Sequence, residues 1–171
     1  HKEALALYRQ ILNKDPKHIR TWIKAAQLMA SLEKYDKADG CIQEALAVSP
    51  EDPELWRERA IIARKANNLE DAVKYIDQSL SCKATDFDSL KEKANVLAAL
   101  KRFKEAIEAY KAALRQNKDD ADAKISLGYA YLAENNTKDA LDAFEAVMKV
   151  EKNNARVWDG RGLAFMMQGD Q

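Results

Sequence analysis

The chain has 171 residues, of which 28 are Lys or Arg and 28 are Asp or Glu, so its formal net charge at pH 7 is zero. The basic surplus that marks a nucleic-acid-binding domain is therefore absent. Hydrophobic residues make up 47% of the chain, which is too many for a disordered segment, and only 5 Gly and 3 Pro interrupt it. Because Ala, Leu, Lys and Glu dominate and turn residues are scarce, the composition predicts an all-helical protein.

The apolar pattern predicts ten helices in chain order and no strand. Their expected ranges are 2–14, 19–32, 36–48, 53–66, 70–82, 87–100, 104–116, 121–134, 138–150 and 155–168. Short turns are expected after every second helix, at Glu33-Lys34, Asn67-Asn68, Lys101-Arg102, Asn135-Asn136 and Gly169-Asp170. Asn and Gly tolerate the left-handed backbone that such turns need. The other connections, at 15–16, 49–53, 85–86, 118–120 and 153–154, hold Pro, Asp or Asn residues that end one helix and cap the next.

A period of 34 residues runs through the chain without insertion or deletion, first visible in the spacing of the tryptophans. One column contains only alanine, at positions 4, 38, 72, 106 and 140, and a second contains only Ala or Gly, at 26, 60, 94, 128 and 162. Large apolar residues fill positions 8, 42, 76, 110 and 144, and Leu or Met fills 12, 46, 80, 114 and 148. A fifth column reads Trp22, Trp56, Leu90, Lys124 and Trp158. Small residues recur where helix axes approach closely, so these columns predict the contacts between paired helices.

The period predicts a single solenoid spanning 1–171. It divides into a trailing half repeat at 1–18, full repeats at 19–52, 53–86, 87–120 and 121–154, and a leading half repeat at 155–171. The last helix carries Trp158, Phe165 and Met166 with no following helix to cover them. Because solenoids usually end in polar caps, we expect a fragment of a longer repeat array, with terminal helices able to associate end to end with another copy.

The repeat unit resembles the tetratricopeptide repeat, whose pattern is W-x2-L-G-x2-Y, then A-x3-F, then P. The fourth full repeat reads Lys124-x2-Leu127-Gly128-x2-Tyr131 and then Ala140-x3-Phe144, with Lys124 replacing the first aromatic residue. Pro16 and Pro50 occupy the closing position, which Ala84, Lys118 and Lys152 fill elsewhere, and Arg59, Lys93 and Arg161 replace the leucine. The resemblance covers the whole chain. It implies a right-handed superhelical α-solenoid of antiparallel helix pairs, whose first helices line a concave groove for a peptide or partner helix.

Two other repeat families are relevant. Pentatricopeptide repeats have 35 residues and bind RNA bases, and the 34-residue spacing with its Trp and Ala columns argues against them. Half-a-tetratricopeptide repeats share the architecture and stay a minor alternative.

No catalytic constellation is visible. His1 and His18 have no Cys or Ser nucleophile placed beside them, and the sequence has no glycine-rich phosphate-binding motif. Cys41 and Cys82 form no C-x-x-C pair, so we expect two free, mostly buried thiols in the reducing cytoplasm. With no run of about 18 apolar residues, no membrane span is expected either. The sequence thus predicts neither an enzyme nor a metal or cofactor site.

The predicted binding residues lie on the first helices of the last three repeats, at 87–100, 121–134 and 155–168, where polar and apolar groups combine. They are Lys91, Asn95, Ile125, Ser126, Tyr129, Arg156 and Leu163. Some tetratricopeptide co-chaperones hold the C-terminal carboxylate of a chaperone with a Lys, two Asn and two basic residues. Lys91, Asn95 and Arg156 match that set, whereas Ser126 and Gly160 depart from it. The resemblance implies a peptide with an acidic residue or free C-terminal carboxylate beside a hydrophobic side chain.

The leading hypothesis is therefore a cytoplasmic protein–protein interaction scaffold or adaptor that binds a peptide or partner segment in its groove. The alternative is a regulatory or targeting domain of a larger enzyme, such as a transferase or kinase, which would have the same groove. RNA binding is a third hypothesis, against which the zero net charge argues because phosphate contacts need a basic surface. Neither a nucleic acid nor a membrane is expected as a partner.

Overall fold

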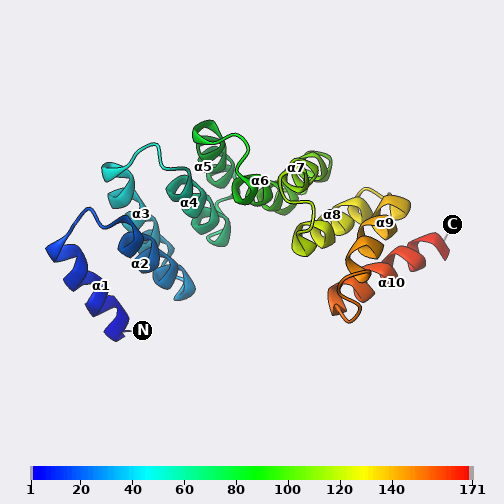
Figure 1. The fold of residues 1–171 in the computed structure, drawn as a ribbon, viewed down its shortest axis with the longest axis horizontal. Coiled ribbons are helices and arrows are strands. Elements are labelled where there is room, and N and C mark those ends of the chain that lie inside the picture. The colour runs from blue at the N-terminus through cyan, green and yellow to red at the C-terminus, as the bar shows by residue number, and fades with distance from the viewer. Residues whose placement is uncertain (1, 170–171) are drawn as a thin grey trace. The chain divides into compact units, whose positions relative to one another are not determined.

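The computed structural model describes residues 2–169, which form ten α-helices and no strand (Figure 1). The helices are α1 (Lys2–Lys14), α2 (Ile19–Ser31), α3 (Tyr35–Val48), α4 (Pro53–Lys65), α5 (Leu69–Cys82), α6 (Phe87–Ala99), α7 (Phe103–Gln116), α8 (Ala121–Ala133), α9 (Thr137–Met148) and α10 (Ala155–Gly169). Each begins and ends within two residues of its predicted range, so the all-α fold is confirmed. His1 and Asp170, which the sequence assigned to the first half repeat and the last turn, lie outside the described residues.

Backbone contacts separate two units, His1–Ala84 with α1 to α5 and Thr85–Gln171 with α6 to α10. Within the first unit α2 pairs with α3 and α4 with α5, and within the second α6 pairs with α7 and α8 with α9. The first helices also touch one another, since α2 contacts α4, and α8 contacts both α6 and α10. The finer division into half and full repeats stays a prediction.

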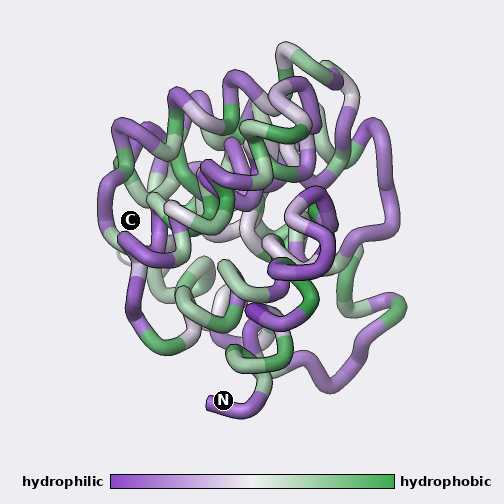
Figure 2. The backbone as a smooth tube through the Cα atoms, turned by 90° about the vertical axis from the view of Figure 1, so that its left-hand side faces the viewer, coloured by the Kyte–Doolittle hydropathy of each residue, from purple (hydrophilic) through white to green (hydrophobic). Residues whose placement is uncertain are grey.

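The alanine column lies at the contacts between helices. Ala38, Ala72, Ala106 and Ala140 have no exposed surface, and each belongs to the second helix of a pair. Figure 2 shows hydrophobic and hydrophilic stretches alternating along the helices, as expected when one face of each helix packs and the other faces water. The packing columns predicted from the period are confirmed at these four alanines.

The position of Gly128 has no room for a side chain, because the Phe144 ring lies directly against it. A Cβ atom added at Gly128 would stand 2.6 Å from the Phe144 ring, closer than side chains pack, and one added at Gly160 would meet the same ring. A Cβ at Gly162 would meet nothing within 4 Å among the described residues. The Phe144 ring of α9 therefore fills the space between α8 and α10. The part of Gly160 in this contact was not predicted, because Gly160 lies outside the column of small residues.

The turns within pairs all use a left-handed residue. Glu33, Asn67, Lys101 and Asn135 have φ angles between 57° and 62°. In each turn the next amide donates back to the carbonyl five residues earlier, as from Lys34 to Met29 at 2.9 Å. This pattern caps the carbonyls at the helix end in the Schellman manner. The predicted turns are confirmed at all four positions, including two whose residues seldom adopt this backbone.

The tryptophan column anchors the loops between pairs. The indole Nε1 donates to the carbonyl oxygen six residues earlier in each case, from Trp22 to Pro16 at 2.9 Å and from Trp56 to Pro50 at 2.7 Å. Trp158 donates in the same way to Lys152 at 3.0 Å. The column therefore fixes how the chain enters the first helix of a pair, a bond that Leu90 cannot make.

Candidate functional site

The predicted binding residues lie on α6, α8 and α10 of the second unit, where α8 contacts both of the other helices. The α6/α8/α10 face consists of the predicted binding residues that are at least partly exposed, together with Asp159, which accepts a hydrogen bond from Tyr129. They are Lys91, Asn95, Ser126, Tyr129, Arg156, Asp159 and Leu163.

Lys91 is held in an ion pair. Its Nζ atom lies 2.9 Å from Oδ1 and 3.2 Å from Oδ2 of Asp120, and 5.5 Å from the centre of the Phe87 ring. Asp120 also accepts a hydrogen bond at 2.7 Å from the amide of Ala123, which caps α8. Lys91 thus links α6 to the start of α8, and its charge is already compensated.

Asn95 also bonds within the unit. Its Oδ1 accepts a hydrogen bond from the Tyr110 hydroxyl at 2.7 Å, and its Nδ2 donates to Glu92 Oε2 at 3.2 Å. These two bonds join α6 to α7 and order the amide. The polar groups of Lys91 and Asn95, which were predicted to bind a ligand, are therefore engaged in hydrogen bonds within the unit.

Tyr129 connects α8 to α10. Its hydroxyl lies 2.8 Å from the Arg156 carbonyl oxygen and 2.8 Å from Asp159 Oδ2, so its single proton is shared between two acceptors. The ring meets Phe144 edge-on, with 5.4 Å between ring centres. Desolvation and the hydrogen bond to Asp159 raise the pKa of Tyr129 to about 12. The hydroxyl is thus fixed, while part of the side chain remains exposed.

Arg156 and Leu163 are the most accessible of the predicted residues. An Arg156 guanidinium nitrogen lies 2.9 Å from Asp122 Oδ1, and both side chains are more than half exposed. Leu163 exposes 42% of its surface, two turns further along α10. Ser126 is partly buried on α8. The face therefore offers an accessible cation and an accessible apolar side chain on the same helix.

The prediction for Ile125 was wrong. Ile125 has no exposed surface and packs in a cluster with Leu132, Phe144 and Val157, so it cannot touch a ligand. The physical reason is that α8 has buried residues all around it, because α9, α7 and α10 all pack against it. A helix that is apolar on every side gives no stripe from which an outward-facing residue can be read.

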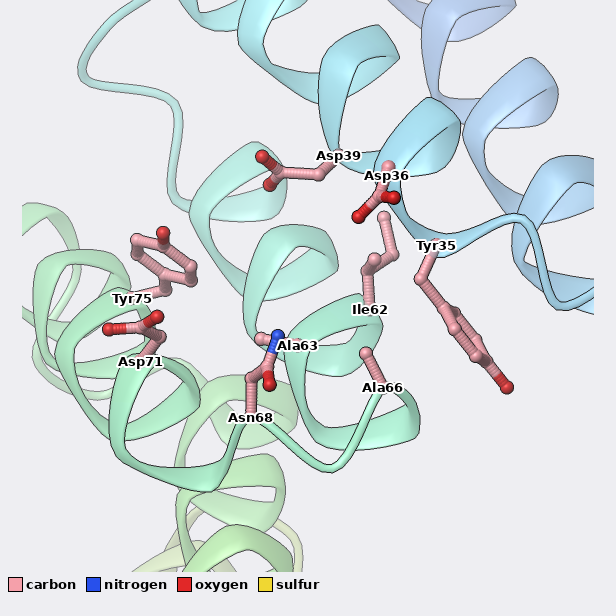
Figure 3. A pocket seen from close by; sticks show the side chains of 9 residues that line it. All are labelled: Tyr35, Asp36, Asp39, Ile62, Ala63, Ala66, Asn68, Asp71 and Tyr75. Carbon is pink, nitrogen blue, oxygen red and sulfur yellow. The ribbon is translucent and has the colours of Figure 1, made fainter.

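A pocket that the sequence did not reveal lies in the first unit (Figure 3). It has a volume of about 270 Å³ and is lined by Tyr35, Asp36, Asp39, Ile62, Ala63, Ala66, Asn68, Asp71 and Tyr75. Arg59 Nε donates to Asp39 Oδ1 at 2.7 Å, and the guanidinium lies 4.2 Å from the centre of the Tyr75 ring. Lys74 pairs with Asp71 at 2.9 Å. Three carboxylates line the pocket, those of Asp36, Asp39 and Asp71. Arg59 and Lys74 compensate the charges of the last two.

Among residues 2–169, no group of three or more His, Cys, Asp or Glu side chains is arranged to hold a metal ion. In the same range, no helix combines the length and hydropathy needed to cross a membrane. Both cysteines are free thiols, but Cys82 is exposed and Cys41 only half-buried, which corrects the expectation of mostly buried thiols. Desolvation raises the pKa of the Cys41 thiol.

Known structures share this fold. The crystal structure of YrrB, described as a TPR protein with an unusual peptide-binding site, aligns with a TM-score of 0.75 at 20% identity, covering 94% of this chain and 83% of that one. The crystal structure of MamA aligns with a TM-score of 0.75 at 16% identity, covering 89% of each chain. A thermophilic TPR protein of Thermus thermophilus aligns with a TM-score of 0.77 at 16% identity, covering 95% of this chain and 89% of that one. At these identities the likeness shows the fold alone.

Sequence comparison supplies the family. No curated protein sequence matches this chain. Two family models, each described as a tetratricopeptide repeat, match residues 23–88 and 97–163, and together they cover most of the 171 residues. The matches fall in both units and include the helix pairs whose columns the period revealed. The chain belongs to the tetratricopeptide repeat family.

Proposed function

We propose that this chain is an interaction scaffold that holds a peptide or partner segment against the α6/α8/α10 face. The observation that carries the proposal is the juxtaposition of accessible Arg156 and Leu163 with the ordered Tyr129 on neighbouring helices. Binding sites combine apolar surface with a few placed polar groups, and this face has both. The peptide-binding site in the description of YrrB supports the same mode of action.

The ligand that we propose carries an acidic residue or a free C-terminal carboxylate beside a hydrophobic side chain. Arg156 is the better cation for it. The Lys91 and Asp120 side chains are 24% and 20% exposed, whereas those of Arg156 and Asp122 are 54% and 68% exposed. An exposed ion pair contributes only about 0–1 kcal/mol, so a ligand carboxylate can replace Asp122 at little cost.

The remaining contacts would come from groups that are already ordered. Tyr129 is held by two acceptors and by Phe144, so its exposed edge presents a rigid surface that loses little conformational entropy on binding. Leu163 supplies the apolar contact. In this arrangement Lys91 and Asn95 position α6 relative to its neighbours without touching the ligand. We infer a cytoplasmic protein or peptide as the partner.

The test begins with a pull-down that uses the 171-residue chain, followed by calorimetry with the segment of the partner that binds. Arg156→Gln removes the accessible cation and should weaken binding about tenfold, which corresponds to about 1.4 kcal/mol. Asp122→Asn removes the competing carboxylate and should strengthen binding. These opposite effects come from the two members of one ion pair, so a general loss of stability cannot produce them.

Two further variants serve as controls. Lys91→Gln should change affinity less than Arg156→Gln, because Lys91 is already bound to Asp120. Arg20→Gln, on α2 of the other unit, should leave affinity unchanged. If Arg20→Gln weakens binding more than Arg156→Gln does, the ligand binds the first unit and the proposal fails.

A further inference from the structure

The pocket of the first unit is enclosed by three helices (Figure 3). Helix α3 supplies Tyr35, Asp36 and Asp39, helix α5 supplies Asp71 and Tyr75, and the last turns of α4 supply the apolar part between them. The volume of about 270 Å³ lies just below the range of about 300–1,000 Å³ that is typical of sites for whole small molecules. A pocket of this size suits a single side chain of a partner.

The acidic groups of the pocket differ in how well their charges are compensated. Arg59 holds Asp39, because its Nε and Nη2 atoms donate to the two carboxylate oxygens at 2.7 and 3.2 Å. Lys74 pairs with Asp71 at 2.9 Å, but the two side chains are 73% and 49% exposed, so the pair is weak. Asp36 is exposed and makes no ion pair or side-chain hydrogen bond with any residue in 2–169. The pocket therefore attracts a cation.

Arg59 shows which cation suits these walls. Its guanidinium bonds to Asp39 of α3 and lies 4.2 Å from the centre of the Tyr75 ring of α5, so both helices hold it. A guanidinium is planar, has five donors and is weakly hydrated, which fits carboxylates beside an aromatic ring better than an ammonium group does. Asp36 and Asp71 lie on opposite sides of the pocket and provide acceptors for a second guanidinium (Figure 3).

The second unit has a hollow at the equivalent place, two repeat periods further along the chain, with a different lining. Lys104 occupies the position of Asp36, and Tyr131 occupies the position of Ala63. No described residue of α9 lines that hollow, whereas α5 lines the pocket of the first unit. The small Ala63 side chain thus leaves α3 and α5 facing each other across the pocket. The acidic pocket is therefore a property of the first unit and not of the repeat.

We propose that the pocket of the first unit binds an arginine side chain of a partner protein. The aliphatic part of that arginine packs on Ile62 and Ala66, and its guanidinium lies between Asp36 and Asp71. There it replaces Lys74, whose exposed ion pair is lost at little cost. This site belongs to the other unit from the α6/α8/α10 face, and its ligand has the opposite charge, so neither proposal depends on the other.

A nuclear magnetic resonance titration of the isotope-labelled 171-residue chain tests the site. The probe is the peptide N-acetyl-Gly-Arg-Gly-amide, and the matched peptide carries citrulline, which has nearly the same shape as arginine but no charge. The arginine peptide should produce saturable shifts of backbone amides in 35–39, 62–68 and 71–75. The equivalent amides of the second unit, in 103–107, 130–136 and 139–143, should not move, and the citrulline peptide should produce no saturable shifts.

Two substitutions should change the affinity in opposite directions. Asp36→Asn removes the uncompensated carboxylate and should weaken binding about fivefold, the effect of one exposed ion pair. Lys74→Gln removes the cation that competes for Asp71 and should strengthen binding. Asp142→Asn changes an exposed residue of α9, alters the net charge as Asp36→Asn does, and should leave the affinity unchanged.

Blocking the pocket provides a further test. Ala63→Tyr introduces the residue that the second unit has at this position, and it should abolish the saturable shifts by separating α3 from α5. Circular dichroism establishes that each variant keeps its helices. The proposal is overturned if the citrulline peptide shifts the same amides as strongly, if Asp36→Asn binds like the unmodified chain, or if a folded Ala63→Tyr variant still binds. Equal shifts in the second unit also overturn it.

Discussion

The Phe144 ring occupies the space that a side chain at Gly128 would need, with 2.6 Å between a ring carbon and the position of the missing Cβ. Phe144 has no exposed surface and cannot move outward into solvent. Gly128→Ala should therefore force the ring or the helices apart and lower the free energy of unfolding by about 1–3 kcal/mol. Urea denaturation measures the change.

Gly162→Ala is the matched comparison, because the residue shares the repeat column but meets no neighbour within 4 Å. It should be neutral or raise stability by up to about 1 kcal/mol, since alanine favours a helix over glycine. Equal effects of the two substitutions would contradict the packing described for Phe144.

Lys101 adopts a φ angle of 59° at the turn between α6 and α7. A residue with a side chain is strained there by about 1–2 kcal/mol, and glycine is not. Lys101→Gly should therefore stabilise the protein by about 1 kcal/mol, although glycine normally destabilises by increasing the entropy of the unfolded chain. Thermal and urea unfolding both measure this gain.

Asn135→Gly serves as the control at the equivalent turn between α8 and α9, where φ is 58°. Because asparagine already tolerates this backbone, the substitution should give a smaller gain. A loss of stability at Lys101 would mean that the left-handed turn is not the dominant constraint.

Trp56→Phe keeps an aromatic ring but removes the donor to the Pro50 carbonyl oxygen. We expect stability to fall by about 1 kcal/mol, the usual net contribution of such a bond. Trp158→Phe removes the same bond on the more exposed α10 helix and should cost less. Denaturation midpoints that rank the two in the opposite order would refute this account of the column.

Tyr129 should contribute to the loss of stability in alkali. Its pKa is raised to about 12 in the folded protein, from an ordinary value of 10.0. The raised value favours the neutral hydroxyl, so the contribution is fully present below about pH 10 and is lost as pH rises through the folded pKa. Tyr129→Phe should flatten the fall in stability between these values. Absorbance titration should show one fewer late-ionising tyrosine, and an unchanged titration curve would contradict the hydrogen bonds described.

The fold was predictable because its determinants recur along the chain. The alanines of the column recur every 34 residues, and those at 38, 72, 106 and 140 are all fully buried. The same packing position can therefore be recognised several times along the sequence. The turns were predictable for the same reason, even where Glu33 and Lys101 by themselves favour other backbone conformations.

The candidate site was only partly predictable, because most of its bonds join residues that the period does not relate; the Arg156–Asp122 ion pair, with one period between its residues, is the exception. The sequence places Lys91 on the correct helix, but its partner Asp120 lies in the loop before α8 and also caps that helix. The burial of Ile125 depends on three neighbouring helices packing around α8. The partner of Lys91 and the burial of Ile125 both depend on packing between different helices, and the apolar pattern of one helix does not predict that packing.

The indole bonds of Trp22, Trp56 and Trp158 all end on a main-chain oxygen. Every residue has that oxygen, so the identity of the side chain at the acceptor position is left unconstrained. Pro16, Pro50 and Lys152 serve equally as acceptors, and the connecting segment is free to diverge while the helix it precedes stays anchored. In this chain the loop residue that accepts the bond can therefore change without loss of the bond, whereas the tryptophan that donates it cannot.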